Sequence, residues 1–380
     1  MKVLITGSRG FVGKNLVSTL NYLDDYQILT FNSDDEDSVL KQHTKDCDFV
    51  VHLAGVNRPE STDEFYSGNV GLVEKLINYL EENNNKSPIL VSSSIQAELD
   101  NDYGKSKKAG EDVLIDYGER AGVDILIYRL PNLFGKWTKP FYNSVVATWC
   151  YQIARGEEIE ISNLDHQLHL VYIDDLIEEI IAALNNQANK VVDHYYNVMT
   201  SYKITLGDLS ETLKSFKESR ENRFIPNMNE SITRKLYSTY LNYLPEDKFS
   251  YNLVEHKDDR GSFSEFIKSK YAGQVSINVS KAHETKGEHW HHSKNEKFLV
   301  VKGKASIKFR EIFSKEVIEY KVSDEKLQVI DIPTGYTHNI TNLSDEDLIT
   351  VMWINEPYNP NSPDTYFKLV EKEGENEWKK

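Results

Sequence analysis

The sequence predicts two fold classes in one chain: a doubly wound parallel α/β sheet, followed by a small all-β barrel. The first prediction rests on short apolar strands that alternate with helix-length segments over the first half of the chain. The second rests on short alternating runs with turn residues and almost no helical pattern from Phe249 onward. A glycine-rich turn directly after the first strand supports the first class.

Strands and helices are expected to alternate along the first half. The predicted strands are residues 2–6, 27–31, 48–53, 89–93 and 124–129, and the predicted helices are residues 12–23, 65–80, 103–121 and a run from about 206 to 241. Ligands of such sheets bind beyond the carboxyl ends of the strands. Those ends carry Gly7, Ala54-Gly55, Ser92–Ser94 and Arg129-Leu-Pro-Asn132.

The turn Gly7-Ser-Arg-Gly10-Phe-Val-Gly13 stands between a predicted strand and a predicted helix. Gly7 permits the turn, Gly10 lets a pyrophosphate approach the backbone, and Gly13 allows tight packing of the helix on the strand. The helix N-terminus adds N–H groups and a partial positive charge. This context predicts a Rossmann-type dinucleotide site rather than an ordinary turn with glycines.

The end of the second strand bears on the phosphate state of the cofactor. NAD-specific sites usually place a carboxylate there to hold the ribose 2′-OH, whereas this chain reads Thr30-Phe-Asn-Ser33. Arg9 in the glycine turn could pair with a 2′-phosphate, which favours NADPH. Asp34 and Asp35 follow closely and keep NADH open as the alternative.

Tyr103 and Lys107 are four residues apart, so a helix places both side chains on one face. An ammonium group about 4 Å from a phenol favours the phenolate by roughly 4 kcal/mol at an effective dielectric near 20. The tyrosine would then approach the pKa that a general acid needs. Taken alone, such a pair is more often a helix surface pair than a catalytic one. A serine hydroxyl at the end of the preceding strand could hold a carbonyl oxygen for that proton.

Several motifs occur together and in one order: Thr6-Gly-x-x-Gly-x-x-Gly13, His52-Leu-Ala-Gly55, Ser92-Ser-Ser94, Tyr103-x-x-x-Lys107 and Arg129-x-x-Asn132. With them, residues 1–240 resemble the extended short-chain dehydrogenases/reductases that act on nucleotide sugars. The resemblance implies that Tyr103 is the acid/base, that Lys107 lowers its pKa and holds the ribose, and that Ser94 orients the carbonyl, with Ser93 as the alternative. It implies contacts with the cofactor from Gly7, Arg9, Gly10, Phe11, Val12, Gly13, Leu53, Ala54, Gly55, Tyr103 and Lys107, and a substrate contact from Asn132.

The second half carries a histidine pattern that predicts a metal site. His289 and His291 are two apart in an expected strand and would share a face, and Glu296 and His338 follow. Three imidazoles and one carboxylate suit a first-row divalent ion, with Zn²⁺ as the first choice and manganese, nickel or ferrous iron as alternatives. His283 and His292 are expected to point away or to support the ligands.

The pattern His-x-His-x₄-Glu-x₆-Gly with Pro-x-Gly-x₂-His-x₃-Asn resembles both motifs of the cupin superfamily, which implies a jelly-roll barrel. Asp259-Arg-Gly-Ser-Phe-Ser-Glu265 resembles the opening strand of nucleotide-sugar 3,5-epimerases. That resemblance implies nucleotide contacts from Arg260, Phe263 and Glu265. Those epimerases use a lysine near the enolate oxygen, whereas Glu296 stands at about that place here.

The two halves in this order resemble the CapF-type family of bifunctional enzymes of capsular polysaccharide biosynthesis, in the UDP-N-acetyl-L-fucosamine pathway. The match includes Asn57-Arg58-Pro-Glu60, so Asn57 and Arg58 join the expected substrate contacts. The resemblance implies C3 epimerisation of a UDP-2-acetamido-2,6-dideoxy-4-ketohexose by the cupin. NADPH-dependent reduction at C4 would follow, giving UDP-2-acetamido-2,6-dideoxy-L-talose. One alternative is a non-catalytic cupin that binds sugar nucleotides or mediates dimerisation; another, which the match at residues 260–265 disfavours, is an iron-dependent dioxygenase.

Composition excludes several classes of protein. The net charge of −16 argues against sequence-independent nucleic-acid binding, and no apolar run is long enough for membrane insertion. The two cysteines and the absence of a secretory signal favour the cytoplasm. We expect a reductase domain over residues 1–244, a cupin domain over residues 245–370 and a disordered tail over residues 371–380. We expect a homodimer.

Overall fold

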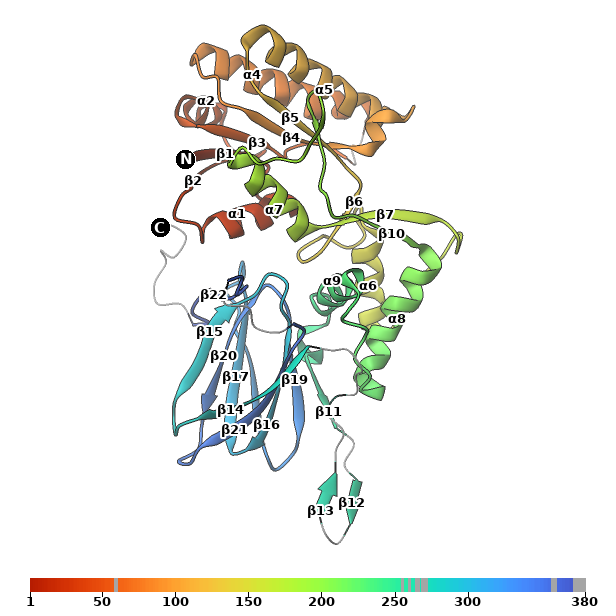
Figure 1. The fold of residues 1–380 in the computed structure, drawn as a ribbon, viewed down its shortest axis with the longest axis vertical. Coiled ribbons are helices and arrows are strands. Elements are labelled where there is room, and N and C mark those ends of the chain that lie inside the picture. Colours follow the sequence, from red (N-terminus) through yellow and green to blue (C-terminus); the bar gives the residue numbers. More distant parts are fainter. Residues whose placement is uncertain are drawn as a thin grey trace. The chain divides into compact units, whose positions relative to one another are not determined.

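The computed structural model describes residues 1–57, 61–253, 256–258, 261–263, 267, 273–356 and 361–371 (Figure 1). The chain divides into two compact units. One contains residues 1–133 and 169–202, and the other contains residues 134–168 together with residues from 203 onward. We call them the α/β unit and the β unit, and each is described by itself.

The α/β unit is built on a seven-stranded sheet in the order β2-β1-β3-β4-β5-β9-β8. Its strands are β1 (Lys2–Thr6), β2 (Gln27–Phe31), β3 (Phe49–His52), β4 (Ile89–Ser94), β5 (Ile125–Leu130), β8 (Lys190–Val192) and β9 (Tyr195–Tyr196). All neighbouring pairs from β2 to β9 are parallel, and β8 joins the edge antiparallel. The predicted doubly wound parallel sheet is confirmed.

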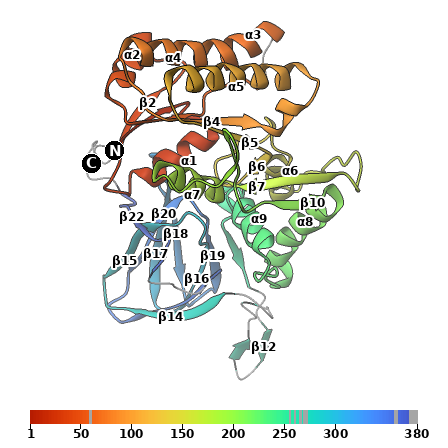
Figure 2. The ribbon, with the colours of Figure 1, turned by 45° about the horizontal axis from the view of Figure 1, so that its top comes forward.

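Helices cover both faces of this sheet. They are α1 (Phe11–Leu20), α2 (Asp37–Asp46), α3 (Thr62–Tyr66), α4 (Leu72–Glu82), α5 (Asp102–Ala121) and α7 (Ile173–Leu184). Helices α2, α4 and α5 lie over one face, and α1 and α7 lie over the other (Figures 1 and 2). Apolar side chains of the strands and of α4 and α5 form the core between them, including Leu4, Val50, Leu76, Leu114 and Ile127. Because helices cover both faces of the sheet, side chains on both sides of its central strands are buried, and the sequences of these strands are largely continuous apolar runs.

The prediction of one continuous α-helix over residues 65–80 is wrong, because the segment is interrupted. Helix α3 is followed by a π-helical segment, η1 (Ser67–Gly71), before α4 begins. Within η1, the Asn69 amide donates to the Val56 carbonyl at 2.9 Å and to Ser106 Oγ at 3.0 Å. The helical period of the apolar residues does not reveal such a segment, because its cause is a polar contact with distant parts of the chain.

The β unit contains two five-stranded sheets, in the orders β11-β19-β16-β21-β14 and β18-β17-β20-β15-β22. Their strands are β11 (Ser250–Asn252), β14 (Gln274–Ser280), β15 (Thr285–Trp290), β16 (Glu296–Lys302), β17 (Lys304–Glu311), β18 (Ile318–Ser323), β19 (Gln328–Ile332), β20 (Tyr336–Asn342), β21 (Leu348–Ile354) and β22 (Tyr366–Phe367). All of their pairings are antiparallel. The predicted cupin-like all-β fold is confirmed.

Helical segments from earlier in the chain complete the β unit. They are α6 (Val145–Arg155), α8 (Leu206–Asn222), α9 (Ser231–Leu241) and the short η3 (Glu246–Lys248). A hairpin of β12 (His256–Asp258) and β13 (Gly261–Phe263) follows β11. A small sheet in the order β10-β7-β6, with β6 (Asn132–Phe134), β7 (Gln167–Tyr172) and β10 (Tyr202–Thr205), marks where the chain passes from one unit to the other.

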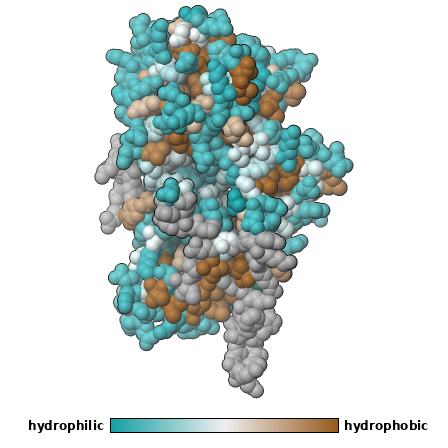
Figure 3. All heavy atoms as spheres, in the orientation of Figure 1, coloured by the Kyte–Doolittle hydropathy of each residue, from teal (hydrophilic) through white to brown (hydrophobic). Residues whose placement is uncertain are grey.

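Hydrophobic residues on the visible face gather in patches, one of them over the all-β part (Figure 3). Val275 and Val279 of β14, which ends its sheet, are 56% and 50% exposed. No described helix is long and apolar enough to cross a membrane.

Candidate functional sites

The glycine turn has the close packing that the sequence predicts. Gly7 has a φ of +72°, and a Cβ there would lie 2.9 Å from the Ala54 backbone. A Cβ at Gly13 would lie 2.6 Å from Ser8 Cα. Helix α1 begins at Phe11 after its N-cap residue Gly10, which has no side chain to cap the first turn. Phe11 and Val12 thus begin the helix, and its terminal N–H groups can receive a phosphate.

Arg9 lies beside two carboxylates at the end of β2. Its guanidinium donates to both oxygens of Asp34, at 2.7 and 2.5 Å, and lies 4.0 Å from Asp35. The Asp34 contact raises the pKa of Arg9 and lowers the pKa of Asp34. Asn32 accepts from Ser8 Oγ and from the Arg9 N–H, at 3.0 and 3.1 Å. The amide at Asn32 thus braces the glycine turn, and Arg9 stands at the rim of the predicted ribose site.

The segment that follows β3 packs against the glycine turn. Thr6 Oγ1 accepts from the Ala54 N–H at 3.2 Å and contacts His52 Nδ1 at 2.9 Å. Burial, with a smaller effect of Lys107, lowers the pKa of His52 to about 3. His52 is therefore a neutral supporting group. Leu53, Ala54 and Gly55 follow it toward the glycine turn.

Gly55, in the segment that follows β3, lies beside the predicted catalytic lysine, Lys107. A Cβ at Gly55 would lie 3.0 Å from Lys107 Nζ and 2.8 Å from Asn69 Oδ1. Lys107 Nζ donates to the Ser92 carbonyl at 3.3 Å. Desolvation lowers the pKa of Lys107 to about 8, although the Glu111 carboxylate acts in the opposite direction. The structure thus places Lys107 between β4 and the loop after β3.

Tyr103 is one helical turn before Lys107 on α5, so the two share a face as predicted. Its ring packs against Phe65, with centroids 5.7 Å apart. The helix is positioned at both ends: Asn101 caps its start through the Gly104 N–H at 2.8 Å, and Gly122 ends it at a φ of +66°. The local sequence therefore sets where the pair stands along the sheet.

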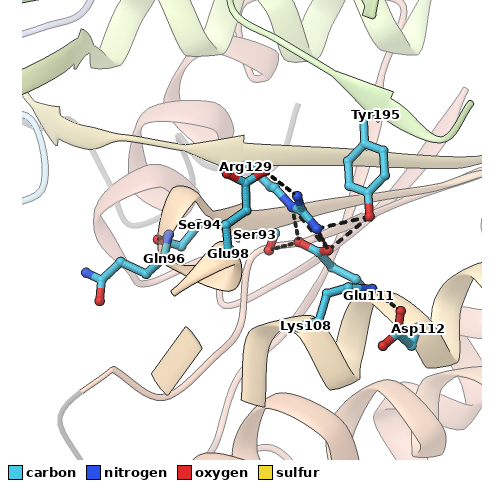
Figure 4. Close-up of polar contacts among 9 residues, drawn as sticks. All are labelled: Ser93, Ser94, Gln96, Glu98, Lys108, Glu111, Asp112, Arg129 and Tyr195. Atoms are coloured by element: carbon cyan, nitrogen blue, oxygen red, sulfur yellow. Dashed lines mark hydrogen bonds and ion pairs between the residues drawn. The ribbon is translucent and has the colours of Figure 1, made fainter. Parts of the chain in front are cut away.

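The two candidate serines have different surroundings (Figure 4). Ser93 is buried and donates to Glu111 Oε1 at 2.5 Å. Ser94 is half-buried, and its oxygen accepts from the Gln96 N–H at 3.2 Å as the cap of η2 (Ile95–Glu98). The Ser93 proton is thus engaged, whereas the Ser94 hydroxyl keeps a proton to donate. This geometry favours Ser94 over Ser93 as the group that holds a carbonyl.

Glu111 is a buried carboxylate that the sequence analysis missed. Arg129 donates to it at 2.6 Å through Nη2 and at 3.0 Å through Nε, and the Tyr195 hydroxyl donates at 3.2 Å (Figure 4). Arg129 also pairs with Glu98 at 2.7 Å. Glu111 stands one helical turn after Lys107, and that spacing was the available signal. The network holds α5 against β4, β5 and β9.

The remaining predicted substrate residues are less constrained. Asn132 is exposed, and its amide donates to the His169 carbonyl at 3.3 Å. Asn57 has a buried Oδ1 with no hydrogen-bond partner among the described residues, so it can receive a donor. Arg58, Arg260 and Glu265 lie outside the described residues. Phe263 ends β13, and its side chain lies outside the description.

The structure brings the four predicted metal ligands together. One nitrogen or oxygen from each of His289, His291, Glu296 and His338 lies within 4.8 Å of the others. His291 Nε2 and His338 Nε2 lie 3.5 and 3.0 Å from Glu296 Oε2. All three atoms are buried, and no described residue gives any of them a well-oriented hydrogen bond. Buried nitrogen and oxygen atoms that converge on one point without hydrogen bonds can act together as ligands of a first-row divalent ion.

The titration behaviour of the cluster follows from this crowding. Burial, with the neighbouring His338 and His291, lowers the pKa of His289 to about 4. Burial opposes ionisation of Glu296, but its contacts with His291 and His338 outweigh that effect and lower its pKa. Glu296 is therefore a carboxylate and His289 a neutral imidazole, the forms in which both bind metals.

The strand that carries the first two histidines is shorter than predicted. β15 ends at Trp290, so His291 is the first residue beyond it. A bulge at Gly287 and Glu288 shifts the register so that His289 pairs with His338. Glu288 has a φ of +56°. The bulge lies before His289, and His289 and His291 still alternate with Trp290, so both rings reach the cluster, with centroids 5.0 Å apart.

The two other histidines lie apart from the cluster. His292 is buried against Trp290 and Tyr366, with ring centroids 4.4 and 5.0 Å away. His283 is exposed and pairs with Asp345 at 3.1 Å. Neither belongs to the group of four.

Comparison with known proteins gives matches over both halves of the chain. The NAD dependent epimerase/dehydratase family matches residues 3–198, and the polysaccharide biosynthesis C-terminal domain matches residues 256–366. A protein of Pseudomonas aeruginosa named UDP-2-acetamido-2,6-beta-L-arabino-hexul-4-ose reductase is 42% identical over 366 residues, which cover 96% of this chain and 98% of that protein.

Solved structures agree with these matches. The capsular polysaccharide assembling protein CapF of Staphylococcus aureus is 50% identical with a TM-score of 0.68, covering 97% of this chain and 100% of that one. A UDP-glucuronic acid 4-epimerase of Bacillus cereus is 18% identical with a TM-score of 0.51, covering 57% of this chain and 82% of that one. That second likeness shows the fold alone.

A dinucleotide-type glycine turn beside a tyrosine–lysine pair defines the class, and the chain belongs to the NAD dependent epimerase/dehydratase family. Within it, the chain is a CapF-type protein, in which that domain is joined to a polysaccharide biosynthesis C-terminal domain.

Proposed function

We propose that this protein is a bifunctional nucleotide-sugar enzyme of capsular polysaccharide biosynthesis. The cupin epimerises C3 of a UDP-2-acetamido-2,6-dideoxy-4-ketohexose. The α/β unit then reduces the C4 ketone to UDP-2-acetamido-2,6-dideoxy-L-talose. The observation that carries the proposal is the coexistence of two separate chemical sites on one chain, Tyr103–Lys107 and the four-ligand cluster. The name of the Pseudomonas relative supports a ketone reductase.

In the reductase, Tyr103 donates the proton to the C4 oxygen while the hydride is delivered to C4. NADPH, when bound, supplies that hydride. Lys107 lies beside Gly55, close enough to the cofactor site to hold the ribose. Its charge favours the tyrosinate that Tyr103 becomes after it donates the proton. Ser94 donates to the carbonyl oxygen and orients it. Arg9 supports NADPH over NADH by offering a cation for the 2′-phosphate.

In the cupin, His289, His291, Glu296 and His338 would hold one divalent ion, with Zn²⁺ as our first choice. Such an ion, when bound, supplies a Lewis acid that polarises the 4-keto group. The ketone acidifies the C3 proton, and reduction removes the ketone. Epimerisation therefore precedes reduction, whichever group takes the proton.

The independence of the two sites is tested with full-length Tyr103→Phe enzyme and the 4-keto sugar in D₂O. We expect NADPH oxidation to fall by about 10²- to 10⁴-fold, because proton donation at C4 is lost. Deuterium incorporation at C3, followed by NMR, should continue. Loss of both activities would contradict two independent sites.

The role of the metal is tested on the same reaction. Chelation should stop deuterium incorporation at C3 and leave reduction of an already epimerised ketone unchanged, and Zn²⁺ should restore the exchange. A metal-loaded wild-type enzyme that gives no exchange would instead support the alternative, a reductase with a non-catalytic sugar-nucleotide-binding or dimerising cupin.

We also propose a cytoplasmic homodimer. The edge strand β14 with exposed Val275 and Val279 supports the dimer, since edge strands present unpaired backbone groups. The buried thiols of Cys47 and Cys150 are unpaired, which suits a reducing compartment. Sedimentation velocity at micromolar concentration tests the dimer, and a monomer would refute it.

A further inference from the structure

We propose that Asp364 is a positioning residue for the metal cluster, because it anchors the loop that joins His291 to Glu296. This inference rests on the proposed metal site. Residues 291–295 are called the ligand loop here, and residues 361–371 the C-terminal segment. Asp364 belongs to that segment, far along the chain from either ligand.

The Asp364 carboxylate binds three consecutive backbone N–H groups of the ligand loop. Oδ1 accepts from the His292 N–H at 2.9 Å. Oδ2 accepts from the N–H groups of Ser293 and Lys294 at 2.8 and 2.9 Å, and from Ser293 Oγ at 2.8 Å. Successive N–H groups that converge on one anion form a concave site with a strong preference for negative charge. The loop is thereby held in one conformation.

The same residue orients a predicted ligand directly. His291 Nδ1 lies 2.5 Å from the Asp364 carbonyl oxygen. A carbonyl can only accept, so Nδ1 carries the proton. In the neutral ring, the form that binds a metal, His291 Nε2 then keeps its lone pair, and this atom lies 3.5 Å from Glu296 Oε2. A hydrogen bond at the far nitrogen is the usual way in which a metal-binding imidazole is fixed in tautomer and orientation.

The C-terminal segment is firmly attached, so Asp364 can act as an anchor. Its strand β22 pairs with β15 beside His289 and Trp290. Further along, Arg310 donates to the Leu369 and Val370 carbonyls at 2.6 and 2.7 Å. Asp364 itself has a φ of +40°, a conformation that a non-glycine residue adopts at a cost. The contacts with the ligand loop offset that cost.

Other groups hold the opposite, carbonyl side of the ligand loop. Ser238 Oγ of α9 and the Asn355 amide donate to the Ser293 carbonyl at 3.0 and 3.3 Å. These contacts do not involve Asp364. Removal of its carboxylate should therefore release the N–H groups and loosen the loop, while the barrel stays folded. This separates positioning of the ligands from stability of the fold.

The test uses full-length Asp364→Asn protein and a matched control, Asp345→Asn, whose carboxylate is 98% exposed. Each protein is stripped with a chelator and titrated with Zn²⁺ by calorimetry. The amide that this substitution introduces is uncharged and has one oxygen acceptor, so it cannot accept at both positions that the carboxylate fills. We expect the Kd for Zn²⁺ to rise about 10- to 100-fold in Asp364→Asn and to stay unchanged in the control.

The melting temperatures of the stripped proteins complete the test. A metal-free Asp364→Asn protein that melts close to the metal-free wild type, with weakened Zn²⁺ binding, supports a positioning role. Unchanged affinity would overturn the inference while leaving the metal site intact. An equal fall in metal-free and metal-bound melting temperatures with no change in affinity would also overturn it. A wild-type protein that binds no Zn²⁺ would reject the proposed metal site itself.

Discussion

At the scale of single residues, the α/β unit depends on charged groups whose partners set their role. Arg9 points toward the end of β2 but is held by Asp34 through both of its oxygens. Both side chains of that ion pair are 64% exposed, so water screens it and a 2′-phosphate can compete for the guanidinium. The Arg9–Asp34 ion pair therefore positions the guanidinium and leaves it able to bind a 2′-phosphate.

We predict that Arg9→Ala raises the Kd for NADPH by at least about tenfold and changes the Kd for NADH by much less. The reason is that a guanidinium–phosphate pair is available only to the phosphorylated ribose. Fluorescence titration of both cofactors measures the two constants, and Lys45→Ala, at an exposed position of α2, serves as a surface control. Equal weakening of both cofactors would contradict the assignment.

His52 gives the unit a pH dependence of known sign. Burial lowers its pKa from 6.5 to about 3, so between these values the unfolded chain binds a proton that the folded chain does not. Stability due to this group is fully present above pH 6.5 and is lost as the pH falls toward 3. The slope is about 1.4 kcal/mol per pH unit in that window.

We predict that His52→Asn flattens the fall in melting temperature between pH 6.5 and 5. Asn removes the titrating ring, so this proton no longer distinguishes the folded from the unfolded state. Thermal unfolding at several pH values measures the effect, with exposed His166→Asn as control. A variant whose melting temperature falls with pH as steeply as that of the wild type would show that other groups dominate.

At the scale of elements, a buried ion network joins α8 to the sheet that contains β16 and β19. Asp331 is fully buried and pairs with Lys297 at 2.5 Å and with Arg220. Burial disfavours the Lys297 ammonium, but Asp331 outweighs it and raises its pKa. The Arg220 guanidinium also lies over the Tyr251 ring, 4.5 Å from its centroid. The network fixes α8 on the barrel.

We predict that Asp331→Asn lowers the free energy of unfolding by about 3–5 kcal/mol, because it leaves two buried cations without a counter-charge. Glu346→Gln is the control, since its ion pair with Lys302 is exposed and worth less than about 1 kcal/mol. Urea unfolding followed by tryptophan fluorescence measures both. Similar losses in the two variants would reject the network as a stabilising feature.

At the scale of the whole molecule, the β unit contains more of the chain than the barrel itself. Trp137 packs on Phe313, with ring centroids 4.5 Å apart, and a Cβ at Gly335 would lie 2.9 Å from its ring. Ser238 and Asn242 of the α9 region bond to the ligand loop and to Thr334. Residues before 245 therefore support the segments that carry the proposed metal ligands.

We predict that a fragment of residues 245–380 is less stable than one of residues 203–380, which keeps α8 and α9. Loss of the helices exposes the apolar and ionic surfaces that they cover. Chemical denaturation and binding of a hydrophobic dye compare the two, and identical midpoints would show that the barrel folds without them. For this reason deuterium exchange is better measured on the full chain than on the shorter fragment.

The sequence by itself determined the architecture and the groups of chemistry-bearing residues. Apolar runs with the period of strands and helices specify which faces are buried, and that requirement is local. Strands β1 and β2 have the predicted bounds, and the histidine motifs predicted the four side chains that now lie within 4.8 Å. The close packing at Gly7 and Gly13 can likewise be predicted from the sequence, because a close backbone approach excludes any larger residue.

Only the tertiary structure decided which groups support those sites. The π segment around Asn69, the Glu111 network that engages Ser93, the bulge at Glu288 and the anchor at Asp364 all depend on partners distant in the chain. Periodicity carries no information about such partners. A buried polar group takes whichever donor or acceptor the fold brings within hydrogen-bond reach, and that choice exists only once the chain has folded.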